Sequence, residues 1–284
     1  MVIRTVGVLG CGLMGSGIAQ VCAAAGYPTI VREVDEAVLK TGLARIEKFL
    51  DDGVTRAKVS RENRDATLSR LTGTTTFAGL APCDIVIEAI IENLDEKKRT
   101  YAAVENVVDE HAIVASNTSS LCITELAAGT RRPDRFAGLH FFSPVPLMKL
   151  VEVIRALTTT DDTFRTVFDF AASIGKEPIH APDRPGFIVN RLLVPYLLDA
   201  IRAYEHGLGS LEDIDKGMRL GCGHPMGPFT LLDFVGLDTT YYIANIMFDE
   251  FREPAYAPPP LLKRMVLAGR LGRKSGRGFY EYSA

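Results

Sequence analysis

A histidine and a glutamate that both lie in apolar segments could do chemistry together. His140 lies near the end of Phe136–Phe141, and Glu152 lies within Leu150–Ile154. A carboxylate in apolar surroundings is costly unless it is paired, and prolines between the two segments let the chain turn back instead of forming a helix. A paired carboxylate fixes the tautomer of an imidazole and raises its basicity. The pattern predicts an acid–base pair, with a strand-edge glutamate facing water as the alternative.

A glycine-rich turn near the N-terminus indicates a second kind of chemistry. It follows a short apolar segment, precedes a helix-like segment, and contains Gly10, Gly12, Leu13, Met14 and Gly15. In a G-x-G-x-x-G turn the glycines let the backbone approach a pyrophosphate, and the start of the helix adds a partial positive charge. Because a strand-like and a helix-like segment flank it, we interpret the turn as a dinucleotide-binding site.

An acidic residue at the end of the next predicted strand bears on the choice of dinucleotide. Glu33 lies about 20 residues beyond the turn, where a carboxylate can accept hydrogen bonds from the adenosine ribose. It would repel a 2′-phosphate, so NAD is favoured over NADP. The neighbouring Arg32 leaves NADP open, because an arginine there can accommodate that phosphate.

Strand-like and helix-like segments alternate through the first two-thirds of the chain. Strands are expected at Thr5–Leu9, Thr29–Arg32, Ile85–Glu88, Ile113–Ser116 and Phe136–Phe141. Helices are expected at Gly15–Ala25, Glu36–Leu50, Arg61–Leu71, Glu96–Val108 and Ile123–Ala128. Short strands rich in Val and Ile that alternate with helices predict an α/β fold, with a Rossmann-like, doubly wound, mainly parallel sheet.

The character of the chain changes near Pro185. Phe187–Tyr204 is a long helical candidate that Pro195 should kink, and prolines separate the helices expected after it. We therefore expect an NAD-binding domain at residues 1–184 and an all-helical C-terminal domain at 185–284, the latter serving as a wall of the substrate cleft and in dimerisation.

Polar residues follow the predicted strands, where a parallel sheet places its ligands. Glu92 follows the third expected strand, and Asn117 and Ser119 follow the fourth. The fifth leads into His140 and Ser143. We expect these residues to gather at one edge of the sheet and to line the cofactor site. His140 is the histidine of this chain that such a position favours as a catalyst.

Composition narrows the classes of protein that this chain can be. Its 284 residues are 47% hydrophobic and 24% charged, as in ordinary globular proteins. A formal net charge of −3 gives no sign of nucleic-acid binding, and no apolar segment is long enough to cross a membrane. The 5 cysteines are far apart and form no CxxC pair, which predicts free thiols and no metal site. We therefore expect a cytoplasmic protein.

Several segments in order along the chain resemble one enzyme family. They are Ser116–Ser120, Arg135–Val153, Pro185–Pro195, Pro225–Pro228, Val235–Thr240 and Lys274–Tyr280. They closely resemble the L-3-hydroxyacyl-CoA dehydrogenases, above all the single-function bacterial 3-hydroxybutyryl-CoA dehydrogenases. The resemblance covers essentially the whole chain. It implies NAD-dependent interconversion of a short-chain (S)-3-hydroxyacyl-CoA and its 3-ketoacyl-CoA, such as 3-hydroxybutyryl-CoA and acetoacetyl-CoA.

The resemblance also implies a role for individual residues. His140 would be the general base in oxidation and the general acid in reduction, with Glu152 as its partner. Ser119 and Asn190 would hydrogen-bond the substrate hydroxyl or the thioester carbonyl. On the cofactor side, the positions that match NAD contacts are Glu92, Lys97 and Lys274.

The sequence departs from the family pattern in two places. Ser143 stands where the family usually has asparagine, and a serine cannot reproduce the paired donor and acceptor of an amide. In the helical excursion that helps to bind CoA in the family, aspartates accompany Lys48, Arg56 and Lys58. These three cations are expected to contact CoA, with solvated helix charges as the alternative.

These departures leave other functions open. A relative could oxidise a small hydroxyacyl group held on an acyl carrier protein, as in polyketide precursor biosynthesis, although CoA is the preferred carrier. A non-catalytic NAD-binding relative is the third possibility, because a fold alone does not imply activity. The resemblance implies a homodimer as well. The residues do not define the acyl chain length or the physiological direction.

Overall fold

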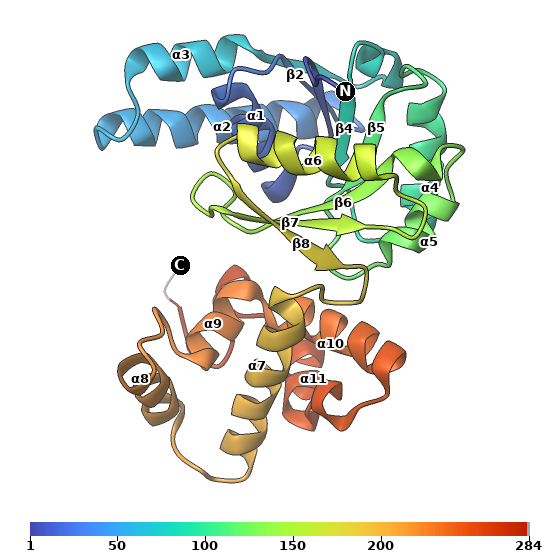
Figure 1. Cartoon of the computed structure of the whole chain (residues 1–284). Helices are drawn as coiled ribbons and strands as arrows, with labels where there is room; N and C mark the ends of the chain where they lie inside the picture. The colour runs from blue at the N-terminus through green and yellow to red at the C-terminus, as the bar shows by residue number, and fades with distance from the viewer. Residues whose placement is uncertain (283–284) are drawn as a thin grey trace. The chain divides into compact units, whose positions relative to one another are not determined.

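The chain divides into two compact units in a computed structural model that describes residues 1–282 (Figure 1). The first unit is Met1–Asp183, and the second begins at Arg184. The division lies next to the boundary expected at residues 184 and 185. The first unit combines strands and helices, whereas helices make up the second.

A single sheet forms the centre of the first unit, all of which is described. Its strands lie in the order β3-β2-β1-β4-β5-β6-β7-β8. Their bounds are β1 (Val6–Leu9), β2 (Thr29–Arg32), β3 (Leu71–Thr74), β4 (Ile85–Glu88), β5 (Ile113–Ser116), β6 (Phe136–Phe141), β7 (Leu150–Arg155) and β8 (Glu177–Pro182). Neighbouring strands are parallel except for the antiparallel pair β6 and β7.

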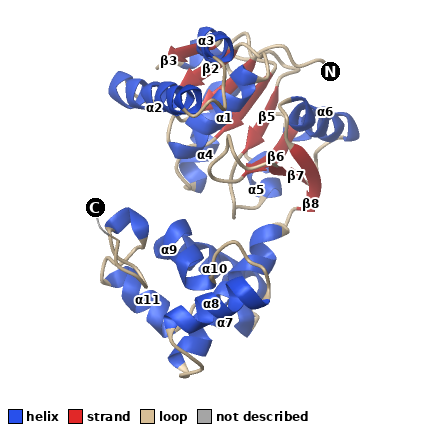
Figure 2. Ribbon diagram, turned by 90° about the vertical axis from the view of Figure 1, so that its left-hand side faces the viewer, coloured by secondary structure: helices blue, strands red, loops and turns tan. Residues whose placement is uncertain are grey.

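Helices cover both faces of this sheet (Figure 2). They are α1 (Leu13–Ala24), α2 (Glu36–Thr55), α3 (Arg61–Ser69), α4 (Leu94–Glu105), α5 (Ile123–Ala128) and α6 (Asp161–Ser173), with short 3-10 turns η1 (Phe77–Leu80) and η2 (Pro133–Arg135). Several of these helices begin at a residue whose side chain accepts a hydrogen bond from a backbone N–H group of the first turn. Asp35 caps α2, Asn93 caps α4 and Thr160 caps α6.

The core of the first unit explains why its strands are so apolar. β1, β4 and β5 are buried along their whole length, as expected for strands covered on both faces. Each fully buried Val, Leu or Ile contributes about 1.5–3 kcal/mol of transfer free energy. This packing makes the sheet a rigid base, and its carboxyl edge carries the loops described below.

Helices packed around their own core form the second unit. They are α7 (Val189–Glu205), α8 (Leu211–Gly221), α9 (Pro228–Val235), α10 (Leu237–Phe251) and α11 (Pro260–Leu267), with 3-10 turns η3 (Pro254–Tyr256) and η4 (Arg273–Ser275). Leu197, Phe229 and Met247 are among the residues of this core. The carboxylate of Asp215 accepts the backbone N–H groups of Phe229 (2.8 Å) and Thr230 (2.9 Å), and so caps the start of α9.

The predicted fold class is confirmed, with differences in detail. The expected helix Arg61–Leu71 ends at Ser69, and the edge strand β3 follows it, which the sequence analysis missed. The strands β7 and β8 were also missing from the expected set. Pro195 lies inside α7, which continues on both sides of it. Within residues 1–282, no helix is long and apolar enough to span a membrane.

Candidate active site

The glycine turn has the backbone geometry that a dinucleotide-binding turn requires. Gly10, directly after β1, has φ of 89°, a conformation that side chains other than glycine rarely adopt. A Cβ at Gly15 would overlap the carbonyl oxygen of Gly10, so α1 lies directly against the turn. No side chain caps α1 at Gly12, and Leu13 is exposed. The first backbone N–H groups of α1 are therefore available to a phosphate.

Glu33 follows β2 and is tied to this turn. Its carboxylate accepts the backbone N–H of Cys11 (2.6 Å) and of Val34 (2.8 Å). Burial, reinforced by Glu33, raises the pKa of the Cys11 thiol to about 11, so the thiol stays neutral. The guanidinium of Arg32 lies 4.1 Å from the ring centroid of Phe77 in a cation–π contact.

His140 and Glu152 lie directly opposite each other on β6 and β7. The distance from His140 Nδ1 to Glu152 Oε2 is 2.7 Å, and the two residues are 5% and 0% exposed. Such a short contact between a buried carboxylate and an imidazole holds the ring in one orientation. The structure thus brings together the pair that the sequence analysis predicted.

The loop after β5 lies at the same edge of the sheet. Asn117 Oδ1 accepts the backbone N–H of Phe141 (2.9 Å), which joins this loop to the strand of His140. Ser119 is half-buried and lies between the buried residues Thr118 and Ser120. The neighbours of Ser119 on both sides are therefore packed, and they hold the backbone that carries its side chain.

Glu92 and Lys97 belong to a polar network rather than to an open surface. Lys97 is 1% exposed, and its Nζ lies 2.6 Å from Glu88 Oε1 and 3.1 Å from Glu92 Oε2. The structure therefore encloses the ammonium of Lys97 between two carboxylates. The sequence gives no sign of the role of Glu88, because an acidic residue at the end of an apolar strand does not show what it pairs with.

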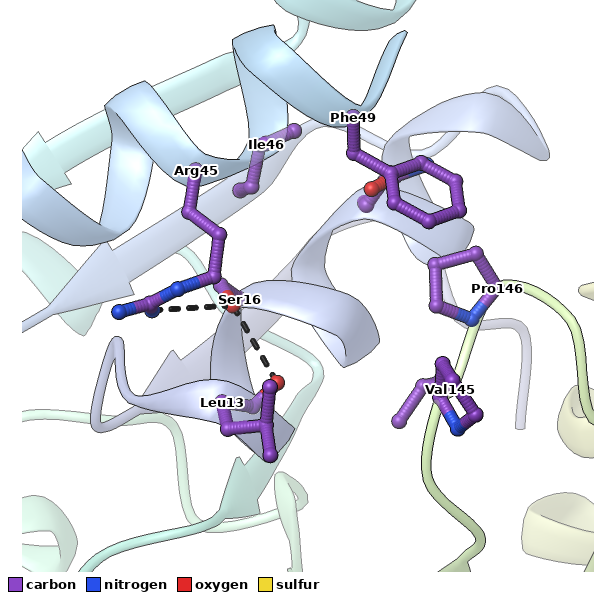
Figure 3. A pocket seen from close by; sticks show the side chains of 9 residues that line it. Leu13, Ser16, Arg45, Ile46, Phe49, Val145 and Pro146 are labelled. Atoms are coloured by element: carbon purple, nitrogen blue, oxygen red, sulfur yellow. Dashed lines mark hydrogen bonds between the residues drawn. The ribbon is translucent and has the colours of Figure 1, made fainter. Parts of the chain in front are cut away.

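A cavity that is partly open to solvent lies beside the glycine turn (Figure 3). The residues that line it are Leu13, Ser16, Gln20, Arg45, Ile46, Phe49, Pro144, Val145 and Pro146. Most of them are apolar, and Arg45 donates to the carbonyl of Cys11 (3.2 Å). One wall is the connection that follows the strand of His140, so this cavity and the acid–base pair share a segment of chain.

A buried lysine fixes that wall. Lys176 Nζ donates to the carbonyl oxygens of Val145 (2.6 Å) and Met148 (2.8 Å). Ser143 lies at the start of the same connection and is exposed. The wall is thus held through its backbone, by a side chain that precedes β8.

The predicted CoA contacts lie on the surface of α2 and just beyond it. Lys48 is exposed and forms an ion pair with Asp52 (3.2 Å), while Arg56 and Lys58 are exposed. Exposed i,i+4 pairs contribute little to stability. These side chains can therefore turn towards a ligand at small cost.

Two predicted site residues belong to the helical unit. Asn190 is half-buried in the first turn of α7. Lys274 lies in η4, with its Nζ 2.6 Å from Asp238 Oδ1. Among residues 1–282 no cluster of His, Cys, Asp and Glu could hold a metal ion.

Comparison with known families accounts for both units. Residues 5–184 match the 3-hydroxyacyl-CoA dehydrogenase NAD-binding domain, and residues 186–282 match the 3-hydroxyacyl-CoA dehydrogenase C-terminal domain. The chain therefore belongs to the 3-hydroxyacyl-CoA dehydrogenase family and is an NAD-dependent oxidoreductase.

Relatives match over nearly the whole chain. The 3-hydroxybutyryl-CoA dehydrogenase of Mycobacterium tuberculosis is 50% identical over 99% of this chain and 99% of its own length. The human mitochondrial hydroxyacyl-coenzyme A dehydrogenase is 46% identical over 99% of this chain and 92% of its own. The crystal structure of (S)-3-hydroxybutyryl-CoA dehydrogenase from Ralstonia eutropha has a TM-score of 0.96 at 45% identity and covers 100% of both chains. The resemblance found in the sequence is confirmed.

Proposed function

We propose that this protein interconverts (S)-3-hydroxybutyryl-CoA and acetoacetyl-CoA with NAD as the cofactor. The observation that carries the proposal is the buried pair of His140 and Glu152 at the carboxyl edge of the sheet, the edge that also carries the glycine turn. Similarity to relatives named for this substrate supports the choice of a short acyl chain.

The side chains perform the proton transfer. In oxidation His140 takes the proton of the C3 hydroxyl through Nε2, because Nδ1 faces Glu152. Glu152 stabilises the imidazolium that results. The hydroxyl of Ser119 and the amide of Asn190 hydrogen-bond the reacting oxygen or the thioester carbonyl. NAD held at the glycine turn would supply the acceptor for the hydride that leaves C3. In reduction His140 returns the proton.

The residues around the glycine turn fit NAD. Gly12 and the start of α1 offer N–H groups to the pyrophosphate, and Glu33 is placed to accept the ribose hydroxyls. The guanidinium of Arg32 lies against the ring of Phe77, and the carboxylate of Glu33 would repel a 2′-phosphate, which together support NAD. We therefore assign NAD rather than NADP. Further contacts on the cofactor side are assigned to Glu92, Asn117, Ser143 and Lys274, with Lys97 acting through Glu92.

We assign the thioester arm to the mainly apolar cavity of Figure 3. Its lining suits a pantetheine chain, which carries apolar stretches between amide groups. Lys48, Arg56 and Lys58 are assigned to the CoA phosphates, because all three are exposed and the ion pair of Lys48 lies at the surface.

Exposed apolar residues of the helical unit, such as Leu192 and Leu267, favour a homodimer. We place this homodimer in the cytoplasm.

A spectrophotometric assay tests the proposed function. Acetoacetyl-CoA should cause rapid loss of NADH absorbance, and NADPH should be a much poorer reductant. Turnover only with a substrate held on an acyl carrier protein would overturn the assignment of CoA. If NADH is oxidised with neither substrate, the protein is not this dehydrogenase.

A further inference from the structure

A buried carboxylate that the proton transfer does not use lies at the end of β4. Glu88 is fully buried, and donors reach both of its oxygens. Oε1 accepts from Lys97 Nζ (2.6 Å) and from the backbone N–H of Ile90 (2.8 Å). Oε2 accepts from Tyr101 OH (2.6 Å) and Ser116 Oγ (2.8 Å). Because a carboxylate removed from water is destabilising unless it is paired and hydrogen-bonded, Glu88 is the centre of an organised network.

The network continues from Glu88 to the loop after β5. Lys97 Nζ lies 3.1 Å from Glu92 Oε2, so one ammonium joins two carboxylates. Glu92 Oε1 in turn accepts from Thr118 Oγ1 and from Ser120 Oγ (3.2 Å). A chain of charge-assisted hydrogen bonds thus runs from the buried end of β4 to the two residues that flank Ser119.

The backbone of this loop is fixed by the same side chains. Thr118 Oγ1 accepts the backbone N–H groups of Ser120 (3.3 Å) and Leu121 (3.0 Å). Ser116 Oγ, which donates to Glu88, accepts the backbone N–H of Thr118 (3.2 Å). Each hydroxyl therefore acts as a donor to a carboxylate and as an acceptor for the loop.

We propose that Glu88 is a positioning residue, whose carboxylate holds the loop after β5 in the conformation that presents Ser119 to the substrate. The inference rests on the proposed role of Ser119. Without the charge of Glu88, Lys97 keeps only Glu92, and the hydroxyls of Tyr101 and Ser116 lose their common acceptor. Burial and the neighbouring carboxylate raise the pKa of Tyr101, so its phenol remains a protonated donor at any working pH.

Glu88→Gln tests the proposal because it keeps the volume and removes the charge. We expect kcat to fall about 10- to 100-fold, as for a small displacement of a reacting group, while the Kd of NADH stays within about threefold. In a Ser119→Ala background the same substitution should change kcat by less than about threefold, because residues that act through one another are not additive. An equal loss in both backgrounds would overturn the proposal.

A second measurement tests the same proposal without an activity assay. Amide hydrogen exchange of the peptide that spans residues 116–122 should become at least about tenfold faster in Glu88→Gln. Unchanged exchange would contradict the inference. Wild-type protein that fails to oxidise NADH with acetoacetyl-CoA would refute the proposed function alone, because the exchange experiment still decides the role of Glu88.

A matched control comes from another buried carboxylate of the same unit. Glu105, in α4, is 8% exposed and accepts the backbone N–H groups of Arg131 and Arg132. Glu105→Gln should destabilise the fold without changing kcat or the exchange of residues 116–122. An equal loss of kcat in Glu105→Gln would show a purely structural effect. If Glu88→Gln does not fold, Tyr101→Phe removes one donor and should give a smaller change of the same kind.

Discussion

The role proposed for the imidazole of His140 depends on the surroundings of its two ring nitrogens. A 2.7 Å contact joins Nδ1 to Glu152, so in the proposed mechanism Nε2 is the nitrogen that exchanges a proton with the substrate. Both residues lie on neighbouring strands, whose backbone fixes the distance between them. The geometry of the proposed acid–base pair is therefore set by the sheet.

Replacing this histidine should separate chemistry from binding. His140→Gln keeps a polar side chain but cannot accept the proton, so kcat should fall about 10²- to 10⁴-fold. The Kd of NADH, measured by fluorescence titration, should stay nearly unchanged. His180→Gln is the control, because His180 is an exposed histidine of β8. Wild-type kcat in His140→Gln would show that another group moves the proton.

Glu33 offers a corresponding test of cofactor binding. Glu33→Ala should raise the Kd of NAD about 10- to 100-fold, since a hydrogen bond to a charged group contributes about 1.5–3 kcal/mol. Asp35→Ala is the control: it removes the cap of α2 and should cost about 1 kcal/mol of stability without weakening NAD binding. Isothermal titration calorimetry measures the first effect and thermal unfolding the second. An unchanged Kd in Glu33→Ala would exclude the ribose contact.

At the scale of elements, the connection between β6 and β7 joins the proposed acid–base pair to the cavity that we assign to the thioester arm. It begins after the strand of His140, forms a wall of the cavity and is held by Lys176. Lys176→Met would leave two carbonyl oxygens without their donor and loosen this wall. We expect the KM for acetoacetyl-CoA to rise about three- to tenfold with kcat changed less than about twofold, because uniform binding is lost rather than transition-state binding.

A lysine that belongs to the connection itself provides the control. Lys149 is exposed and lies 3.6 Å from Glu177, a weak surface pair. Lys149→Met should leave KM unchanged, as initial-rate kinetics would show. If both substitutions raise KM equally, the effect is one of surface charge and not of the buried anchor.

The sequence predicted the central strands well because their signal is strong. β1, β4, β5 and β6 are short, apolar and buried, so composition alone distinguishes them. β3 reads Leu-Thr-Gly-Thr and is only half-covered, so nothing in it marks a strand. β8 carries a proline at its second and last positions, which is tolerated at the edge of a sheet but conceals a strand in the sequence.

The candidate site, like the sheet, could be predicted from the sequence only in part. The pair of His140 and Glu152 was predictable because an isolated carboxylate in an apolar segment needs a partner. The network of Glu88 was not, because its donors come from a helix and from another strand, and no local pattern states that they converge. Sequence patterns indicate which groups need partners, whereas only the fold shows which partners they have.

At the scale of the whole molecule, the cysteines divide by accessibility. Cys11, Cys22 and Cys83 are buried in the first unit, and Cys222 is exposed in the second. Burial raises the pKa of Cys22 and of Cys83 to about 12. Because the thiolate is the reactive form, these thiols should react only when the unit opens. Cys222 should be labelled rapidly by a maleimide at pH 8.

Labelling of Cys11, which lies inside the glycine turn, then tests whether NADH binds to the first unit. At a concentration of NADH 100 times its Kd, binding stabilises the folded unit by about 2.7 kcal/mol. Labelling of the buried thiols, followed by peptide mass spectrometry, should therefore slow about 100-fold when opening limits the reaction. Cys222 should react at the same rate with and without NADH. If NADH fails to protect Cys11, the cofactor does not bind at this turn, and the assignment of Glu33 and the start of α1 would have to be abandoned.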